Sequence, residues 1–292
     1  MRLLAVAVCA AAGLGAAELK IDHATVCGTD LEAMRQTMTS ALAGVQPEYG
    51  GPHSNHATEM ALVSFPDGSY LELMGIQTKA DPAAVEKHEW NRFLRNDAGP
   101  CAFAMHVTDI EREVQDLKSA GIAVGEPETA GRTRPDGAKL VWQTASVGPG
   151  NRGSLFPFLI ADQTPRELRA FPSGKPTTDG FGGIAQVVIG VRDLNGAIAQ
   201  YERAFRLSPP MRQRNQKFGA MAWFQGTPIV LAQGVGADSW LSKRVAEYGD
   251  APVAFVLGDG KNTGSDSGSN WFGHSVTWMD ERKLGWRLGI LH

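Results

Sequence analysis

The chain has 292 residues, of which 43% are hydrophobic and 20% charged, and its formal net charge at pH 7 is −3. This composition is typical of globular domains and excludes a largely disordered chain. Because no block of basic residues stands out, we do not expect nucleic acid or an anionic membrane surface as a partner.

Residues 1–17 have the pattern of a secretory signal peptide. Arg2 is the positive start, residues 3–14 form an apolar run, and the small residues 15–17 precede an expected cleavage before Glu18. The run is too short to anchor the chain in a bilayer. A buried N-terminal helix is the alternative, but no polar residue gives the run a solvent face. We therefore expect an exported protein, periplasmic or secreted, with no membrane span after cleavage.

The stretch from Ile21 to Gln77 contains the first structural unit. An alternating strand, 21–28, is followed by Asp30, which is a good helix N-cap, and by a helix over 31–42 with apolar residues at helical spacing. A Gly/Pro-rich loop covers 50–56. Two strands follow, near 60–65 and 70–77, and the sequence Pro-Asp-Gly at 66–68 predicts the turn between them.

The same order of elements recurs along the rest of the chain. The second unit has strand 101–107, cap Asp109, helix 110–120 and strands starting at 122, 140 and 155. The third unit has a strand from Ile184, cap Asp193, helix 194–205 and strands 220–225 and 228–233. The fourth is degraded: strand 253–257 leads into a loop, 258–269, where a helix is expected, and strands 272–278 and 286–291 end the chain.

This repeated order of elements predicts an α+β fold of four βαβββ modules. Paired modules close a curved mixed sheet over a shared cavity, which gives two tandem domains. We place the first domain at 18–165, a Pro/Gly/Thr-containing linker at 166–182, and a second, degenerate domain at 183–292.

Several motifs of the first half resemble the glyoxalase-like branch of the vicinal oxygen chelate superfamily. They are Asp22-His23, the cap Asp30, Gly50-Gly51-Pro52-His53, Tyr70-Leu71-Glu72-Leu73 and the later segment Leu155-Phe156-Pro157-Phe158-Leu159. The resemblance implies a divalent ion held by the first and last strands of two paired modules. Such an ion chelates neighbouring substrate oxygens and stabilises an anionic intermediate. The sequence does not distinguish Zn, Fe, Mn and Ni.

Only the first module carries both ligand types that the resemblance implies. His23 lies seven residues before Asp30, and the same offset before the other caps reaches Ala102 and Gln186. The position of Glu72 corresponds to Phe156 or Phe158 in the second module and to Val230 or a neighbour in the third. His23 and Glu72 are therefore the predicted catalytic residues and the predicted metal ligands, in an incomplete ligand set. The alternative is a buried, hydrogen-bonded pair without chemistry.

Other polar residues are predicted to contact a ligand in the same cavity. Strand alternation places Cys27 and His106 on the face of His23, and Tyr70 on the face of Glu72, while His53 lies on the neighbouring loop. His106 could equally be a core histidine, and His53 could order its loop.

For Cys27 we expect a buried free thiol rather than a reactive one. A disulfide to Cys101 is the remaining alternative. It is disfavoured because alternation along the strand points Cys101 to the opposite face.

Two functions from different classes remain. One is an exported glyoxalase-like enzyme that acts on a small oxygen-rich molecule, of the lyase, isomerase or dioxygenase type. Glyoxalase I itself is disfavoured, because the ligand set is incomplete and glutathione is scarce outside the cytoplasm. The other is a metal-free protein that binds or sequesters a small molecule. The partner is a small molecule in both cases, and the protein is a monomer or a homodimer.

Overall fold

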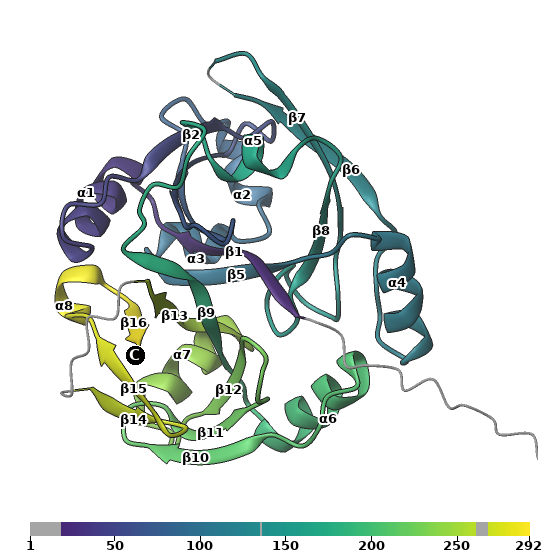
Figure 1. The fold of residues 1–292 in the computed structure, drawn as a ribbon, viewed down its shortest axis with the longest axis vertical. Helices are drawn as coiled ribbons and strands as arrows, with labels where there is room; N and C mark the ends of the chain where they lie inside the picture. Colours follow the sequence, from purple (N-terminus) through teal and green to yellow (C-terminus); the bar gives the residue numbers. More distant parts are fainter. Residues whose placement is uncertain (1–18, 135, 261–267) are drawn as a thin grey trace, which may run out of the picture.

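A computed structural model describes residues 19–134, 136–260 and 268–292. The expected signal peptide, Pro135 and most of the expected loop 258–269 lie outside the described residues. The described chain forms two eight-stranded sheets with helices around them (Figure 1). The strands of the first sheet are β1 (Lys20–Cys27), β2 (Glu48–Pro52), β3 (Thr58–Ser64), β4 (Tyr70–Ile76), β5 (Gly99–His106), β6 (Glu128–Thr133), β7 (Lys139–Ala145) and β8 (Phe158–Asp162).

The second sheet and the helices complete the fold. The strands are β9 (Phe181–Gly190), β10 (Met211–Asn215), β11 (Gly219–Trp223), β12 (Ile229–Gln233), β13 (Ala251–Asp259), β14 (Ser269–Trp271), β15 (His274–Trp278) and β16 (Arg287–Leu291). The helices are α1 (Leu31–Ala41), α2 (Pro82–Lys87), α3 (Asn91–Arg95), α4 (Ile110–Ser119), α5 (Arg166–Ala170), α6 (Leu194–Phe205), α7 (Trp240–Tyr248) and α8 (Glu281–Leu284).

Both sheets have the same strand order around a central antiparallel pair. The orders are β2-β3-β4-β1-β5-β8-β7-β6 and β10-β11-β12-β9-β13-β16-β15-β14. On each side of the centre a parallel pair, such as β1–β4 or β5–β8, joins the first and last strands of one module. This arrangement confirms the predicted α+β class with two vicinal-oxygen-chelate-type domains.

The aspartates that were predicted to begin helices do so. The carboxylates of Asp30, Asp109 and Asp193 each accept a hydrogen bond from a backbone N–H in the first turn of α1, α4 and α6. These amides have no partner inside the helix, so the side chain supplies one and sets the first residue of the helix.

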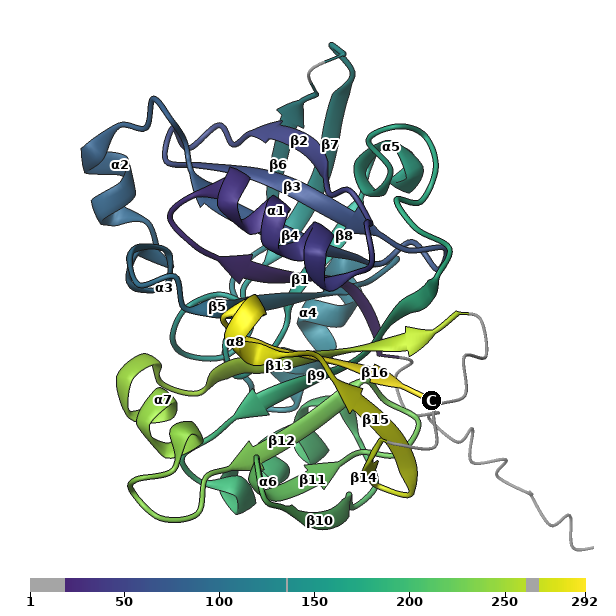
Figure 2. The same cartoon turned by 90° about the vertical axis from the view of Figure 1, so that its left-hand side faces the viewer.

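The two domains stack through their central strands (Figure 2). Ala24 and Val26 of β1 belong to the same hydrophobic core as Val187 and Ile189 of β9. Alternate residues of β1, such as His23 and Thr25, point the other way, into the first domain. Strand β1 is therefore buried on both faces, and its polar side chains lie at the bottom of the concave side.

Edge strands are where the sequence-based expectations and the structure differ. β2 runs through Gly50–Pro52, which was expected to be a loop, and β6 at Glu128–Thr133 was not expected at all. A strand was expected to start at Ile122, but the structure has only an isolated antiparallel β-bridge there, between Val124 and Val147. Edge strands gain their hydrogen bonds from one neighbour and carry little of the core, so their apolar pattern is weak.

Candidate functional site in the first domain

The concave side of the first sheet contains a cavity of about 460 Å³. This volume lies within the range of small-molecule sites. The cavity is lined by residues from β1, β3, β4, β6, β7, β8 and α5, from the loops before β3 and β8 and from the segment between α2 and α3. They include His23, His53, Met60, Tyr70, Glu72, Met74, His88, Trp90, Arg132, Trp142, Arg152, Phe158 and Arg169.

His23 and Glu72 meet in this cavity because β1 and β4 are parallel neighbours. The pairing places Thr25 opposite Glu72 and His23 opposite Tyr70. The Thr25 hydroxyl donates to Glu72 Oε2 over 2.9 Å, and His23 Nε2 lies 3.9 Å from the same oxygen. The imidazole also stacks on the Tyr70 ring. The predicted pair thus shares one cavity, while its catalytic and metal-binding roles stay predictions.

His53 adds a second imidazole to this pair. Its Nε2 lies 3.5 Å from Glu72 Oε1, and its Nδ1 lies 2.8 Å from the Thr58 hydroxyl. Burial alone would raise the pKa of Glu72, but His53, His23 and the Thr25 hydrogen bond outweigh it and lower that pKa to about 2. Glu72 is therefore a carboxylate at neutral pH, with one imidazole near each oxygen.

Asp22 orients His23, and the sequence alone does not reveal this role. The register between β1 and β5 shifts between Ile21 and His23, so Asp22 is the extra residue of a β-bulge. A bulge breaks the alternation of side chains, and here it places the Asp22 carboxylate 2.6 Å from His23 Nδ1. With Nδ1 held in this way, Nε2 is the nitrogen that faces Glu72.

Two arginines from α5 hold Asp22. Arg169 donates to both oxygens of Asp22, over 2.9 and 2.7 Å, and to the hydroxyl of Tyr70 over 2.7 Å. Arg166 also donates to Asp22. Burial would raise the pKa of Asp22, but Arg169, His23 and Arg166 hold it well below its ordinary value. Helix α5 lies within the segment expected to be a linker, and no motif in the sequence connects it with Asp22.

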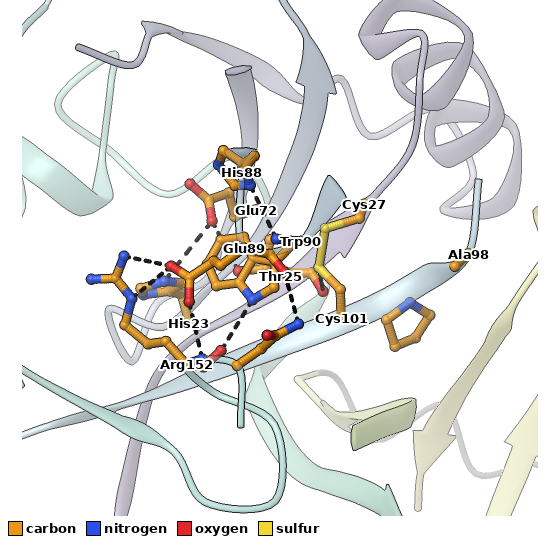
Figure 3. The surroundings of a disulfide bond; sticks show 12 residues. His23, Thr25, Cys27, Glu72, His88, Glu89, Trp90, Ala98, Cys101 and Arg152 are labelled. Carbon is orange, nitrogen blue, oxygen red and sulfur yellow. Dashed lines mark hydrogen bonds and ion pairs between the residues drawn. A yellow bond between two sulfur atoms is a disulfide. The ribbon is translucent and has the colours of Figure 1, made fainter. Parts of the chain in front are cut away.

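The segment between α2 and α3 lines the cavity, and Figure 3 shows its residues Glu89 and Trp90 beside Arg152. The Trp90 indole donates to the Arg152 carbonyl over 3.1 Å, and the Arg152 guanidinium pairs with Glu89 at 2.7 Å. The loop that carries Arg152 reaches this position through Gly153, whose φ is +73°. A Cβ there would lie 2.8 Å from the backbone of Phe103, so glycine is required for this close approach.

His106 lies beside a different group of charges. Its Nε2 is 3.8 Å from Asp162, and Asp22, His106 and Asp162 offer ligand atoms within 4.8 Å of one another, a spacing that could hold a metal ion. However, Arg169 and Arg166 already pair with both carboxylates. A divalent ion there would have to displace two guanidinium groups, so we regard this group as a neutral ion-pair network.

Cys27 is not a free thiol, contrary to our expectation. It forms a disulfide with Cys101, 74 residues away (Figure 3). The register of β1 and β5 shifts again between Thr25 and Val26, so Cys101 is the extra residue of a second bulge. The bulge turns the Cys101 side chain toward Cys27, and the alternation argument against the bridge fails there. Cys27 is therefore no ligand-contacting thiol.

The strand registers also fix the positions that correspond to the metal ligands of the resembled superfamily. β5 and β8 pair Ala104 with Phe158, as β1 and β4 pair Thr25 with Glu72. Phe158, rather than Phe156, therefore occupies the position of Glu72 in the second module. Neither Phe158 nor Ala102 can bind a metal ion, so donors for one must come from His23, Glu72 and their neighbours.

The two curved sheets have the architecture of the vicinal oxygen chelate superfamily. A sequence profile described as a glyoxalase-like domain matches residues 21–205, and the chain belongs to this family. No curated protein sequence matches the chain.

Two solved structures with TM-scores above 0.5 support the fold. A hypothetical protein from Staphylococcus aureus is 15% identical, with 93% of this chain and 98% of that chain covered and a TM-score of 0.63. A xylose isomerase-like TIM barrel/4-hydroxyphenylpyruvate dioxygenase fusion protein is 11% identical, with coverages of 94% and 49% and a TM-score of 0.52. A mutant 4-hydroxymandelate synthase from Streptomyces coelicolor is 14% identical, with coverages of 82% and 71% and a TM-score of 0.48. None of the helices in the described part of the chain is long and apolar enough to cross a membrane.

Proposed function

We propose that the first-domain cavity binds a small oxygen-rich molecule together with one divalent metal ion held by His23, His53 and Glu72. The observation that carries this proposal is that the Nε2 atoms of both histidines face the two oxygens of one buried carboxylate. Two imidazoles and a carboxylate form a common ligand set for a divalent metal with open positions. When bound, such an ion polarises substrate oxygens and stabilises negative charge on them.

The surrounding contacts support this donor set. Asp22 fixes the Nδ1 of His23, and the Thr58 hydroxyl fixes that of His53. Metal-binding histidines commonly have such a second hydrogen bond, which selects the tautomer and orients the ring. Glu72 is ionised because of its low pKa, and Thr25 holds one of its oxygens.

The chain's own residues also provide for proton transfer. His23 has Asp22 behind it at 2.6 Å and the cavity in front. This role is the alternative to metal binding: if no ion occupies Nε2, that nitrogen faces the cavity while Asp22 holds Nδ1, and it is placed to exchange a proton with a bound molecule. Tyr70 stacks on the imidazole and restricts its rotation.

Titration of metal-stripped protein with Mn²⁺ or Zn²⁺ in a calorimeter tests the proposal. We expect one ion per chain, and binding weakened at least about 10-fold in His53→Ala and Glu72→Gln. His106→Ala is the control and should bind as the wild type does. Absence of binding at micromolar metal would reject the metal and favour a metal-free binding protein. If His106→Ala lost metal binding while the other two variants kept it, the ion would have to bind at the Asp22–Asp162 network instead.

We further propose that the protein is exported. The residues of the expected signal peptide support this, and so does the disulfide between Cys27 and Cys101, because such bonds persist mainly in oxidising compartments. Mass spectrometry of the protein from its natural host should find an N-terminus at Glu18. An intact Met1 in the mature protein would contradict export by this route.

A further inference from the structure

Arg132 lies at the seam where the first sheet nearly closes. β2 and β6 are the two edge strands of this sheet. Arg132 of β6 donates a hydrogen bond through one terminal nitrogen to the carbonyl of Gly50 in β2, so a single side chain joins the two edges. The guanidinium also lines the cavity.

The charge of Arg132 has no carboxylate against it. Only 8% of its surface is exposed, and in residues 19–134, 136–260 and 268–292 it forms no ion pair. The other two arginines of the cavity differ: Arg169 pairs with Asp22 and Asp162, and Arg152 pairs with Glu89. Buried charges are normally paired, because removing them from water is costly.

The electrostatics of Arg132 agree with this description. Burial lowers the pKa of Arg132 from its ordinary value, and Tyr70 and then Glu72 oppose that effect. Arg132 keeps guanidinium donors for a ligand, since it lines the cavity and only one of its terminal nitrogens donates to Gly50.

We propose that Arg132 binds the carboxylate of a small organic acid, which is the ligand of the cavity. A guanidinium binds a carboxylate through two parallel hydrogen bonds, and this pairing supplies the missing negative charge. Trp142 and Phe158 line the same cavity and suit an apolar body attached to the acid. The inference rests on the proposed function, because it names the ligand class of that site.

Calorimetry with benzoate as the probe tests the inference, and benzamide serves as its neutral counterpart. The protein is kept in EDTA, so that the result does not depend on metal binding. We expect benzoate to bind more tightly than benzamide, and Arg132→Gln to weaken benzoate binding by roughly 10- to 100-fold while benzamide binding is unchanged. Arg132→Lys should retain part of the preference for the anion.

Arg112→Gln is the matched control. Arg112 is an exposed residue of α4 that pairs with Asp116 and does not line the cavity, so this variant should bind benzoate as the wild type does. Thermal unfolding of Arg132→Gln checks that the seam still forms. If a folded Arg132→Gln binds benzoate normally, or if sulfate binds as tightly as benzoate, the inference is wrong. The metal titration decides the proposed function independently.

Discussion

The two domains share a backbone design but differ in what their concave faces contain. In both central strand pairs the register shifts at corresponding places, so Asp22 and Cys101 in the first domain match Ala185 and Val253 in the second. In the first domain one bulge carries the Asp22 carboxylate, which orients His23, and the other carries Cys101, which forms half of the disulfide. In the second they carry small apolar side chains. The bulges belong to the architecture, and the residues placed on them decide the chemistry.

The interior of the second domain is filled. Gln186 occupies the position of His23, and its side-chain oxygen accepts a hydrogen bond of 2.6 Å from the Trp271 indole. Val230 occupies the position of Glu72 and is buried. Trp271, Phe218 and Trp278 pack ring against ring on this side. Among the described residues, the positions of His23 and Glu72 thus carry no histidine–carboxylate pair in the second domain, and buried apolar rings pack beside them.

The largest expected effect of a single substitution lies in this filled interior. Trp271→Ala removes a fully buried side chain and should destabilise the protein by about 3–5 kcal/mol. Trp142→Ala, in the half-buried wall of the first cavity, should cost much less stability but weaken ligand binding. Urea unfolding and benzoate titration of both variants measure the contrast. Equal losses of stability would mean that the two interiors are filled alike.

The disulfide is the next test, since the second domain has none at the corresponding Gly190 and Val253. It closes a segment of 74 residues, and in the chain-entropy description a loop of that size contributes about 4 kcal/mol. Wild-type protein should unfold at lower urea concentration after reduction. The double variant Cys27→Ala/Cys101→Ala should be as unstable as the reduced wild type and insensitive to reductant. A wild type that reductant does not affect would show that the bond contributes little.

The smallest expected effect concerns Glu72, whose corresponding residue in the second domain, Val230, cannot ionise. Its pKa is lowered from 4.5 to about 2 in the folded protein. The contribution of its charge is therefore present above pH 4.5 and is lost as the pH falls toward 2. The stability difference between wild type and Glu72→Gln should shrink by about 2 kcal/mol from pH 7 to pH 3.

Urea unfolding across this pH range measures the difference. Glu86→Gln is the control, because the side chain of Glu86 is 70% exposed and surface ion pairs contribute little. A wild-type curve parallel to that of Glu72→Gln would mean that Glu72 is not preferentially ionised in the folded state.

Much of the fold and the first pair of site residues were predictable from local patterns. Alternating apolar residues marked the core strands, and aspartates before apolar helices marked the caps of α1, α4 and α6. His23 and Glu72 were found because each sits at a recognisable place in a strand of the same module. One incorrect start, Leu155 rather than Phe158 for β8, involves Pro157, which has no N–H to give to a sheet.

The remaining parts of the site come from segments that have no local relation to one another. Arg169 donates to Asp22, which is 147 residues away in the sequence. Arg132 donates to the carbonyl of Gly50, which is 82 residues away, and so joins the two edge strands. No pattern within a window of ten or twenty residues records such pairings, because they depend on how the sheet curves and which edges meet.

The sequence by itself thus determined the modules, their helix caps, the class of fold and the histidine–carboxylate pair. The tertiary structure decided the disulfide, the Asp22–His23 contact and the arginines of the cavity. For the disulfide and the Asp22–His23 contact the physical reason is the β-bulge: one extra residue in a strand redirects the following side chains, so the alternation in the sequence no longer states which face a residue occupies. For the arginines it is the curvature of the sheet, which brings distant segments together.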